Sequence, residues 1–505
     1  MEKIAIILVD TYSAKLIIAG SEKPETFSLI DEEVEQINLG LDQEDHFLKK
    51  PQVDECVRVL KDFRKICEMY SVKKTIAIAR FNEDAKPKNI YSFFGEILAT
   101  CGFDFTILTP EAENNYIYSG IINTYDMPKG AIACVTSNSV NLIEYNRRNV
   151  VNSEKLGFGP TNLLKMYPLE TFGVGPAFAK MEKYVETQLS DADWLEKVDP
   201  EFAFIGSGSF YTDLSKMARK LLKYPLDRDD QMVVSSEVAQ KIYEQLKTLD
   251  ISKSKKLKGI DEPRADIFVA GLAIINGIFK AAKREQIVIA SRGLVEGIIL
   301  SEFVQSTAEK PISDVIGFGL ANETVGLTEL EKTHSENVYN LSMLLFKQLR
   351  VLHKLPRGYV KILRIASVLH DAGKKVNAIG YAKYSYNVIL GSNVYGADHK
   401  ELVLAAFVAS LVDGSDLSIA EWVKYKDMLT EEDLDAVKKL GVIVALAENF
   451  DRTKNGLVVD VNCDILGDSV IMKTVATADA DYLIRKALNC GKEFEKNFHK
   501  KLEIL

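Results

Sequence analysis

The sequence lacks the features that mark several protein classes. Its six cysteines are spread over 505 residues without a Cys-x-x-Cys pair, which predicts neither a disulfide framework nor a zinc ribbon. No apolar run is long enough to span a bilayer. The short apolar run at residues 1–10 ends in an aspartate, and no small-residue cleavage site follows it. We therefore expect a cytoplasmic protein with no membrane partner.

An excess of positive charge is also missing. The net charge is −9 and the pI is near 5.5, which argues against nucleic acid as a partner because non-specific binding to it depends on a basic surface. These values still allow a local basic pocket for a small polyanion. With 47% hydrophobic and 27% charged residues the composition is that of an ordinary globular protein, and the length predicts two to four domains.

Strand and helix patterns alternate through the first 300 residues. Residues 4–19 have the pattern of two strands around a turn, and residues 53–70 carry apolar side chains at helical spacing. The strand-turn-strand pattern returns in AIACVTSNSVNLIEY, residues 131–145. The alternation of strands and helices is typical of an α/β fold. The repeat of the strand-turn-strand pattern predicts a second copy of the same half-domain.

The pattern changes near residue 310. Pro and Gly are more frequent from there to about residue 328, and the periodicity is weak, which favours a linker. Amphipathic helical patterns dominate residues 330–450, while VVDVNCDIL and the remaining tail indicate a small appended piece.

Three stretches carry a family resemblance. They are LTPEAENNYIYSG (108–120), LKGIDEPRADIFVAGLAIINGI (257–278) and SRGLVEGIIL (291–300). They resemble the exopolyphosphatase / guanosine pentaphosphate phosphohydrolase family, and the resemblance covers nearly the whole chain. It implies an α/β actin-like fold (the ASKHA, ribonuclease H-like class) of duplicated half-domains, followed by an all-α HD-type domain. The implied boundaries are half-domain I at 1–128, half-domain II at 129–308, a linker at 309–328 and the HD-type domain at 329–505.

Members of this family cut the terminal phosphoanhydride of polyphosphate or of guanosine pentaphosphate in a cleft between the half-domains. The resemblance therefore implies a small polyanionic phosphate ligand, a divalent metal (Mg²⁺ or Mn²⁺) and a homodimer. Such a cleft needs glycine-lined loops around phosphate oxygens, and carboxylates that hold the metal and position a water. The family's catalytic glutamate matches Glu113.

The first phosphate loop of this chain is short and altered. Where the family has Asp-x-Gly-Ser-Asn-Ser, this chain has DTYS, which keeps Asp10 as a catalytic candidate and Ser13 as a ligand-binding one. Tyr12 stands at the glycine position, where its bulk would crowd a phosphate. A looser alignment places Glu83 where the family has a phosphate-binding arginine, and its charge would repel a polyanion.

The second phosphate loop has lost more of the family's residues. The family pattern DxGGGSTE is CVTSNSVN here, so Cys134 replaces the aspartate, Asn141 replaces the glutamate and only Ser139 is retained. Because Glu113 alone stabilises no developing negative charge, we expect a catalytically impaired cleft. A weaker candidate for holding a phosphate is the turn before a predicted helix, formed by Gly206, Ser207, Gly208 and Ser209.

Four of the six histidines lie between residues 330 and 400. His334 lies on an apolar helical face, the pair His370 and Asp371 ends an apolar helix, and Asp451 lies in LAENFDRTKNG. This set resembles the H…HD…D signature of HD phosphohydrolases and implies one divalent metal. Two imidazoles and two carboxylates also suit a transition metal. The remaining histidines with charged neighbours are predicted to lie on the surface: His46, His353 and His499.

Three functions remain open at this point. The chain is a phosphohydrolase-like member of the family with an impaired cleft and its remaining chemistry or ligand binding in the HD-type domain. Alternatively, it is an active exopolyphosphatase that uses Glu113 and Asp10, or a non-catalytic regulatory or scaffold protein. Metal content separates the first from the third, and polyphosphate turnover separates the second from both.

Overall fold

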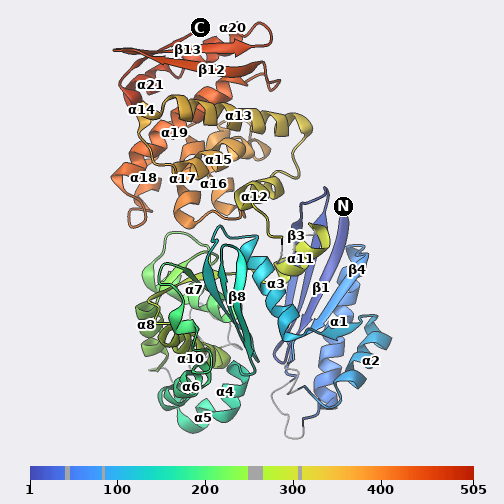
Figure 1. Cartoon of the computed structure of the whole chain (residues 1–505). Coiled ribbons are helices and arrows are strands. Elements are labelled where there is room, and N and C mark those ends of the chain that lie inside the picture. Colours follow the sequence, from blue (N-terminus) through green and yellow to red (C-terminus); the bar gives the residue numbers. More distant parts are fainter. Residues whose placement is uncertain (40–45, 82–85, 248–264, 305–309) are drawn as a thin grey trace. The chain divides into compact units, whose positions relative to one another are not determined.

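The computed structural model describes residues 1–39, 46–81, 86–247, 265–304 and 310–505. They form two compact units, Met1–Ser313 and Asp314–Leu505, each with its own helices and sheets (Figure 1). No helix among the described residues combines the length and the apolar character needed to cross a membrane.

The first half of unit 1 is built on a five-stranded sheet with the order β3-β2-β1-β4-β5. The central strand β1 runs antiparallel to β2 and parallel to β4. The strands are β1 (Glu2–Val9), β2 (Ser13–Ser21), β3 (Ser28–Gln36), β4 (Lys74–Ala79) and β5 (Phe105–Ile107). The helices are α1 (Lys50–Met69), α2 (Ile90–Cys101) and α3 (Pro110–Ile122).

The second half repeats this arrangement in a six-stranded sheet with the order β10-β11-β9-β6-β7-β8. Here β6 runs antiparallel to β7 and parallel to β9, as β1 does to β2 and β4. The expected second copy of the half-domain is therefore confirmed. The strands are β6 (Gly130–Val135), β7 (Val140–Asn146), β8 (Asn149–Leu156), β9 (Ala203–Ser207), β10 (Val233–Ser235) and β11 (Gln286–Ala290).

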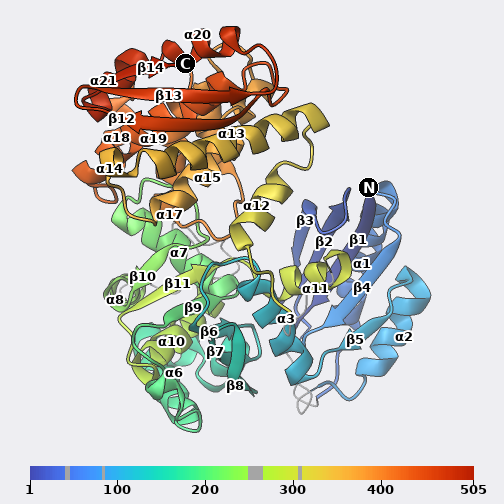
Figure 2. The ribbon, with the colours of Figure 1, turned by 45° about the horizontal axis from the view of Figure 1, so that its top comes forward.

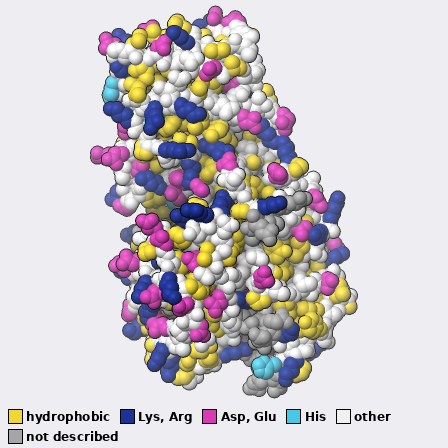
Figure 3. Space-filling model, in the orientation of Figure 1, with side chains coloured by type: hydrophobic (Ala, Val, Ile, Leu, Met, Phe, Trp, Pro, Cys, Tyr) yellow, Lys and Arg dark blue, Asp and Glu magenta, His cyan; other side chains and the backbone are white. Residues whose placement is uncertain are grey.

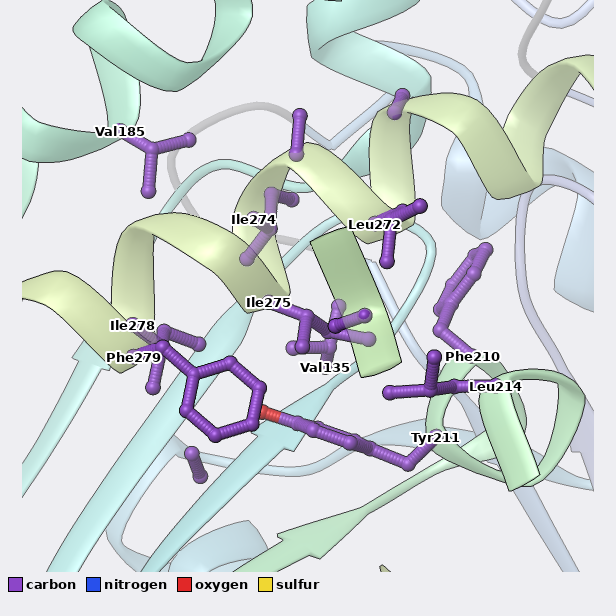
Figure 4. Close-up of a cluster of buried hydrophobic side chains, with 14 of the residues drawn as sticks. Val135, Val185, Phe210, Tyr211, Leu214, Leu272, Ile274, Ile275, Ile278 and Phe279 are labelled. Carbon is purple, nitrogen blue, oxygen red and sulfur yellow. The ribbon is translucent and has the colours of Figure 1, made fainter. Parts of the chain in front are cut away.

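The core of this second half is organised around α10, whose residues from Ile267 to Phe279 are all buried. A helix that is apolar on every side must be enclosed, and α10 packs against α4, α6, α7 and α8. Figure 4 shows Leu272 and Ile275 of α10 beside Phe210 and Leu214 of α7. The helices are α4 (Pro160–Met166), α5 (Leu169–Phe172), α6 (Val174–Leu189), η2 (Leu195–Lys197), α7 (Ser209–Leu222), α8 (Ser236–Lys247), α10 (Ala265–Ala281) and α11 (Leu294–Phe303).

Helix α11 packs back onto α3, and glycines make this contact close. A Cβ atom on Gly120 of α3 would lie 1.9 Å from the carbonyl oxygen of Gly293. A Cβ atom on Gly297 of α11 would lie 2.0 Å from the carbonyl oxygen of Tyr116. Only glycine allows two backbones to approach this closely, so glycines of the stretches 108–120 and 291–300 hold this helix pair together.

Unit 2 is mostly helical. Helices α13, α15, α17 and α19 pack on one another, and α19 is buried without interruption from Leu440 to Glu448. Helix α12 lies in the stretch 309–328 that we expected to be a linker. The helices are α12 (Val315–Glu323), α13 (Glu329–Gln348), α14 (Arg350–His353), α15 (Tyr359–Leu369), η4 (Ala372–Lys375), α16 (Tyr381–Gly391), α17 (His399–Ser410), α18 (Ile419–Val423) and α19 (Glu431–Phe450).

The chain then forms a small sheet with the order β12-β13-β14. Strand β12 contacts α13, and β14 contacts α20 and α21, so the sheet lies against the helices (Figure 2). These elements are β12 (Val458–Ile465), β13 (Ser469–Ala476), α20 (Asp481–Leu488), α21 (Gly491–Phe498) and β14 (Lys501–Ile504). On the face drawn in Figure 3, acidic and basic side chains are interspersed on both units.

Candidate functional site

The loop between β6 and β7 is closed by its own hydrogen bonds. The hydroxyl oxygens of Thr136 and Ser139 lie 2.9 Å apart, and Ser139 Oγ donates to Asn141 Oδ1 at 3.2 Å. Asn141 Nδ2 donates in turn to Asn114 Oδ1 of α3 at 2.6 Å. All four residues are buried. Ser139 therefore belongs to a polar network that ties the loop to α3.

Asp10 caps the turn between β1 and β2. Its Oδ1 accepts from the backbone N–H groups of Tyr12 at 2.7 Å and Ser13 at 2.8 Å. The Tyr12 side chain is 8% exposed and belongs to the hydrophobic core of the second half-domain. Thr11 Oγ1 donates to Asn138 Oδ1 at 3.0 Å and so joins the two loops. Tyr12 thus packs the two halves together.

Glu113 lies in the first turn of α3, which Thr109 caps by accepting from the backbone N–H of Ala112. Glu113 Oε1 accepts from Arg80 Nη2 at 2.5 Å, and Oε2 accepts from Lys155 Nζ at 2.6 Å. The residue is 3% exposed. Burial raises the pKa of this carboxyl, but the two cations outweigh it and hold the pKa below its ordinary value. Glu113 is thus an ionised carboxylate with both oxygens engaged.

Sequence reasoning missed Arg80 and Lys155. The available signal was that Arg80 directly follows the apolar strand β4, whereas Lys155 lies on the polar edge strand β8 and carried no such signal. Only the register of the sheet reveals that Lys155 stands opposite Asn141. Cys134 is buried close to Arg80, and burial raises the pKa of its thiol. Glu83 and residues 257–264 lie outside the described residues.

The turn at residues 206–209 contains two glycines that packing requires. A Cβ atom on Gly206 would lie 2.4 Å from the ring of Tyr211. Gly208 has a φ of 104°, and a Cβ atom there would lie 2.4 Å from the carbonyl oxygen of Val135. Both glycines are therefore explained by the close approach of α7 and β6.

The two serines of the same turn have different surroundings. Ser207 Oγ donates to the backbone carbonyl of Arg292 at 3.1 Å and is buried. Ser209 is the first residue of α7. A role of this turn in holding a phosphate stays a prediction.

In unit 2, the structure brings His334 and His370 together. His334 lies on the inner face of α13 and His370 follows α15, and both imidazoles are fully buried. Their ring centroids are 5.2 Å apart. Nδ1 of His334 lies 2.8 Å from Asp451 Oδ2, and Nδ1 of His370 lies 2.8 Å from the carbonyl oxygen of Ser367. Because a carboxylate and a carbonyl only accept, each Nδ1 carries the hydrogen.

The other ring nitrogens of the two histidines are buried and unpaired: neither Nε2 has a hydrogen-bond partner among the described residues. One ring nitrogen of each histidine and a carboxylate oxygen of Glu448 lie within 4.8 Å of one another. Glu448 is 3% exposed and lies on α19, and it was not among the predicted ligands. Its signal was present, because Glu448 precedes Asp451 by three residues and so lies on nearly the same helical face.

The carboxylates of the predicted ligands Asp371 and Asp451 are engaged by other protein groups. Asp451 is fully buried, and its Oδ2 accepts from His334 while its Oδ1 accepts from the backbone N–H of Gly456 at 2.8 Å. Asp371 Oδ2 lies 3.2 Å from Lys374 Nζ and 3.7 Å from Lys454 Nζ. Neither aspartate belongs to the group of converging atoms. The converging atoms among the described residues thus come from the two predicted histidines and from Glu448, which was not predicted, and metal binding by the predicted set of four stays a prediction.

This group has the chemistry of a metal site. Burial lowers the pKa of His370, so its imidazole is neutral and its Nε2 lone pair is available to a metal. A hydrogen bond from the opposite ring nitrogen to a carboxylate or carbonyl is the usual outer support of a metal-binding histidine. Two imidazoles and one carboxylate suit Zn²⁺, Mn²⁺ or Fe²⁺ better than Mg²⁺, and they leave coordination positions for a water and a ligand.

Comparison with known proteins identifies the family. Residues 18–306 match the Ppx/GppA phosphatase family, and residues 322–492 match domain III of the Ppx/GppA phosphatases. The chain belongs to the Ppx/GppA phosphatase family. The resemblance found in the sequence is thereby confirmed, and unit 2 is the family's domain III.

Curated relatives match parts of the chain. It is 23% identical over 316 residues to a bifunctional 3-dehydroquinate synthase/phosphatase of Fusobacterium nucleatum, covering 59% of this chain and 46% of that protein. It is 29% identical over 119 residues to a guanosine-5′-triphosphate,3′-diphosphate pyrophosphatase of Aeromonas salmonicida, covering 23% of each protein. The chain thus spans less than half the length of these curated relatives.

A solved structure supports the fold. The exopolyphosphatase of Cytophaga hutchinsonii is 17% identical and superposes with a TM-score of 0.54, covering 60% of this chain and 98% of that one. Together with the family match, this likeness confirms the expected actin-like fold with mixed sheets, followed by a helical region.

Proposed function

We propose that this Ppx/GppA-family protein is a metal-dependent phosphohydrolase whose working centre lies in unit 2, at His334, His370 and Glu448. The two N-terminal half-domains then have a structural role, and they hydrolyse little or no polyphosphate. The names of the relatives, a phosphatase and a pyrophosphatase, support phosphate chemistry as the general activity. The location in unit 2 is our own inference.

One observation carries the proposal: one ring nitrogen each of His334 and His370 and a carboxylate oxygen of Glu448 lie within 4.8 Å of one another, and Nε2 of both buried histidines has no hydrogen-bond partner among the described residues. A buried polar atom without a partner is costly, and two such atoms side by side are rarely kept in a core. The Nδ1 atoms are both fixed by acceptors, so each ring is held in place and Nε2 is the nitrogen left to bind a metal. A divalent cation would satisfy all three groups at once.

The surrounding residues fit phosphate chemistry. A divalent metal bound here would polarise a phosphoryl oxygen and acidify a water. Lys374 Nζ lies 3.2 Å from Asp371 Oδ2 and 4.0 Å from Glu448 Oε1, close enough to meet a phosphoryl oxygen. Arg452 forms an ion pair with Glu448. Asp451 orients His334, and Ser367 orients His370.

The contacts in unit 1 support the impaired cleft. Glu113 is held by Arg80 and Lys155, so a phosphate that sought these cations would have to displace a buried carboxylate. Tyr12 fills the position of a phosphate-contacting glycine, and Asn141 is committed to Asn114. One observation favours the alternative of an active exopolyphosphatase: Glu113 is kept ionised, as a water-activating base must be.

Metal content and phosphate release together test the proposal. The purified protein should bind one Mn²⁺ or Zn²⁺ per chain after dialysis, measured by mass spectrometry of the metal. His370→Ala and Glu448→Ala should each lose it, whereas His499→Ala, at an exposed histidine of the same unit, should keep it. Phosphoester substrates should release phosphate in the wild type and not in His370→Ala.

A different result would contradict this assignment. Strong Mg²⁺-dependent phosphate release from polyphosphate that survives His370→Ala and disappears in Glu113→Gln would place the activity in unit 1. A protein that binds no metal and releases no phosphate from any substrate would favour the regulatory or scaffold alternative.

A further inference from the structure

A pocket of about 550 Å³ opens along one face of α19 in unit 2. Its floor follows the helix from Lys438 to Asn449, a distance of roughly 16 Å at about 1.5 Å per residue, and Arg452 lies just beyond the end of the helix. One wall is the loop 411–417, and the other is formed by α20, α21 and the turn between them. The volume lies within the range of about 300–1,000 Å³ that holds small organic ligands.

One end of this pocket reaches the proposed metal centre. Glu448 lines the pocket and also belongs to the group with His334 and His370. Tyr381 and Arg452 line the same end. Lys374 Nζ lies 4.3 Å from the centroid of the Tyr381 ring. A molecule seated in the pocket would therefore place one of its ends beside the metal ligands.

The charges at this end favour an anion once a metal is present. Three carboxylates, Asp371, Glu448 and Asp451, are matched there by three cations, Lys374, Arg452 and Lys454. Imidazoles that bind a metal through a ring nitrogen do so in the neutral form and add no charge to this count. A divalent cation would leave an excess of two positive charges, which a phosphomonoester dianion neutralises.

The rest of the pocket has no such excess. Among the lining residues Lys438 and Lys486 are balanced by Asp413 and Asp416, and Lys496 lies 3.2 Å from a Glu493 carboxylate oxygen. A polyphosphate chain, with a charge on every unit, would find nothing to neutralise it along this floor. A ligand with one phosphate and an uncharged body needs positive charge only at the metal end, so it fits this distribution of charge.

The floor and rim suit a polar but neutral body. Gly441, Val442 and Ala445 give the floor small or apolar side chains, which leaves room for a flat group. The rim carries the amide of Asn489, which can both donate and accept hydrogen bonds, and the amide oxygen of Asn449, whose Nδ2 donates to the carbonyl oxygen of Ala445. This combination resembles the pockets that hold small organic ligands, mostly apolar with a few placed polar groups.

We propose that this pocket binds the organic part of a phosphomonoester of about the size of a nucleoside monophosphate. Its phosphate lies at the end formed by Glu448, Arg452 and Tyr381, and its uncharged body lies over Ala445 toward Asn489. The proposal rests on the metal centre described above and adds the class of substrate. It also separates this pocket from the polyphosphate chemistry of the wider family.

The test uses the full-length protein loaded with Mn²⁺, with its metal content measured on the same sample. Adenosine and guanosine 5′-monophosphate and inorganic phosphate are titrated in by calorimetry. We expect at least one nucleotide to bind about tenfold or more tightly than phosphate, because the body adds contacts that phosphate lacks.

Two substitutions block the pocket in different ways. Ala445→Leu fills the buried floor, and Asn489→Trp covers the rim from an exposed position where folding is not at stake. Both should weaken the nucleotide about tenfold or more and leave the affinity for phosphate and the metal content unchanged. Asn462→Trp, at an exposed position on β12 outside the pocket, is the matched control and should change nothing.

The outcomes separate the two proposals. Metal-loaded protein that binds the nucleotides no better than phosphate, or equally well in Asn489→Trp, overturns the pocket assignment and leaves the metal centre standing. Protein that takes up no metal overturns both. Tighter binding of a long polyphosphate than of either nucleotide, reduced by Asn489→Trp, would show that the pocket serves the other substrate class.

Discussion

Asp451 and His334 are joined by a buried hydrogen bond in which Nδ1 of the imidazole donates to Oδ2 of the carboxylate at 2.8 Å. Asp451 directly follows α19, and His334 lies in the second turn of α13. Asp451 Oδ1 is held by the backbone N–H of Gly456, so the carboxylate cannot rotate away. The pair therefore determines which nitrogen of His334 faces His370 and Glu448.

Replacing this carboxylate should weaken metal binding without removing a ligand. Asp451→Asn leaves an uncharged acceptor beside His334, which lowers the basicity of the imidazole and holds its ring less firmly. We expect the affinity for Mn²⁺ or Zn²⁺ to fall about 10- to 100-fold, as outer-sphere changes usually cause. Competition with a metal-binding dye measures this. Asp464→Asn, at an exposed aspartate of β12, should leave the affinity unchanged, and an unchanged affinity in Asp451→Asn would assign the pair a structural role only.

Glu113 should contribute strongly to the stability of unit 1. Glu113→Ala leaves Arg80 and Lys155 buried, 18% and 8% exposed at the side chain, without their shared carboxylate. Loss of one partner of a buried ion pair costs about 3–5 kcal/mol. Unfolding by urea, followed by the fluorescence of Trp194 in a Trp422→Phe background, measures unit 1 because these are the two tryptophans of the chain.

A matched control lies in the same helical turn. Glu111 is exposed, so Glu111→Ala should change the stability by about 0.5 kcal/mol or less. Equal effects of the two substitutions would mean that the ion pairs of Glu113 contribute nothing specific.

His353 is a buried residue, and the prediction that it lies on the surface is wrong. It is 2% exposed, its Nε2 donates to the carbonyl oxygen of Phe346 at 2.7 Å, and its Nδ1 accepts from the backbone N–H of Leu355 at 2.9 Å. These bonds require the neutral imidazole. Burial lowers the pKa of His353 below its ordinary value of 6.5, and nearby Lys439 and Arg350 act in the same direction.

This lowered pKa makes unit 2 sensitive to mild acid. The unfolded chain takes up a proton near pH 6.5 and the folded chain does so only at lower pH, so the stabilising contribution is complete above pH 6.5. It declines as the pH falls from there toward the folded-state pKa, by up to about 1.4 kcal/mol per pH unit. Urea unfolding followed by Trp422 in a Trp194→Phe background, with a chelator present, measures this decline.

The control for this experiment separates His353 from other groups. His353→Gln should be less stable at pH 7.5 and should show a flatter dependence between pH 7 and 5.5. His499→Gln, at an exposed histidine, should keep the wild-type slope. A wild-type slope in His353→Gln would mean that another group causes the acid sensitivity.

Much of the fold was predictable because its signals are local. Buried strands such as β1 and β6 carry continuous apolar runs, and helices such as α1 repeat apolar residues at helical spacing. The edge strands β3 and β8 were not predicted. Both are largely exposed and rich in polar residues, so nothing in their composition distinguishes them from loops, and their neighbours in the sheet make them strands.

The sequence by itself determined the family, the duplicated half-domains, and the presence of two histidines and several carboxylates at the ends of apolar helices. Only the tertiary structure decided which polar groups meet. Glu448 and Asp451 lie about one turn apart at the end of α19. The packing of α13 and α15 against that helix places a carboxylate oxygen of Glu448 within 4.8 Å of a ring nitrogen of each histidine, and Asp451 against Nδ1 of His334. Likewise Glu113, Arg80 and Lys155 are far apart in sequence and meet only through sheet register and the placing of α3. Periodicity reports which face of an element is buried, whereas the partner of a buried charge depends on how separate elements pack.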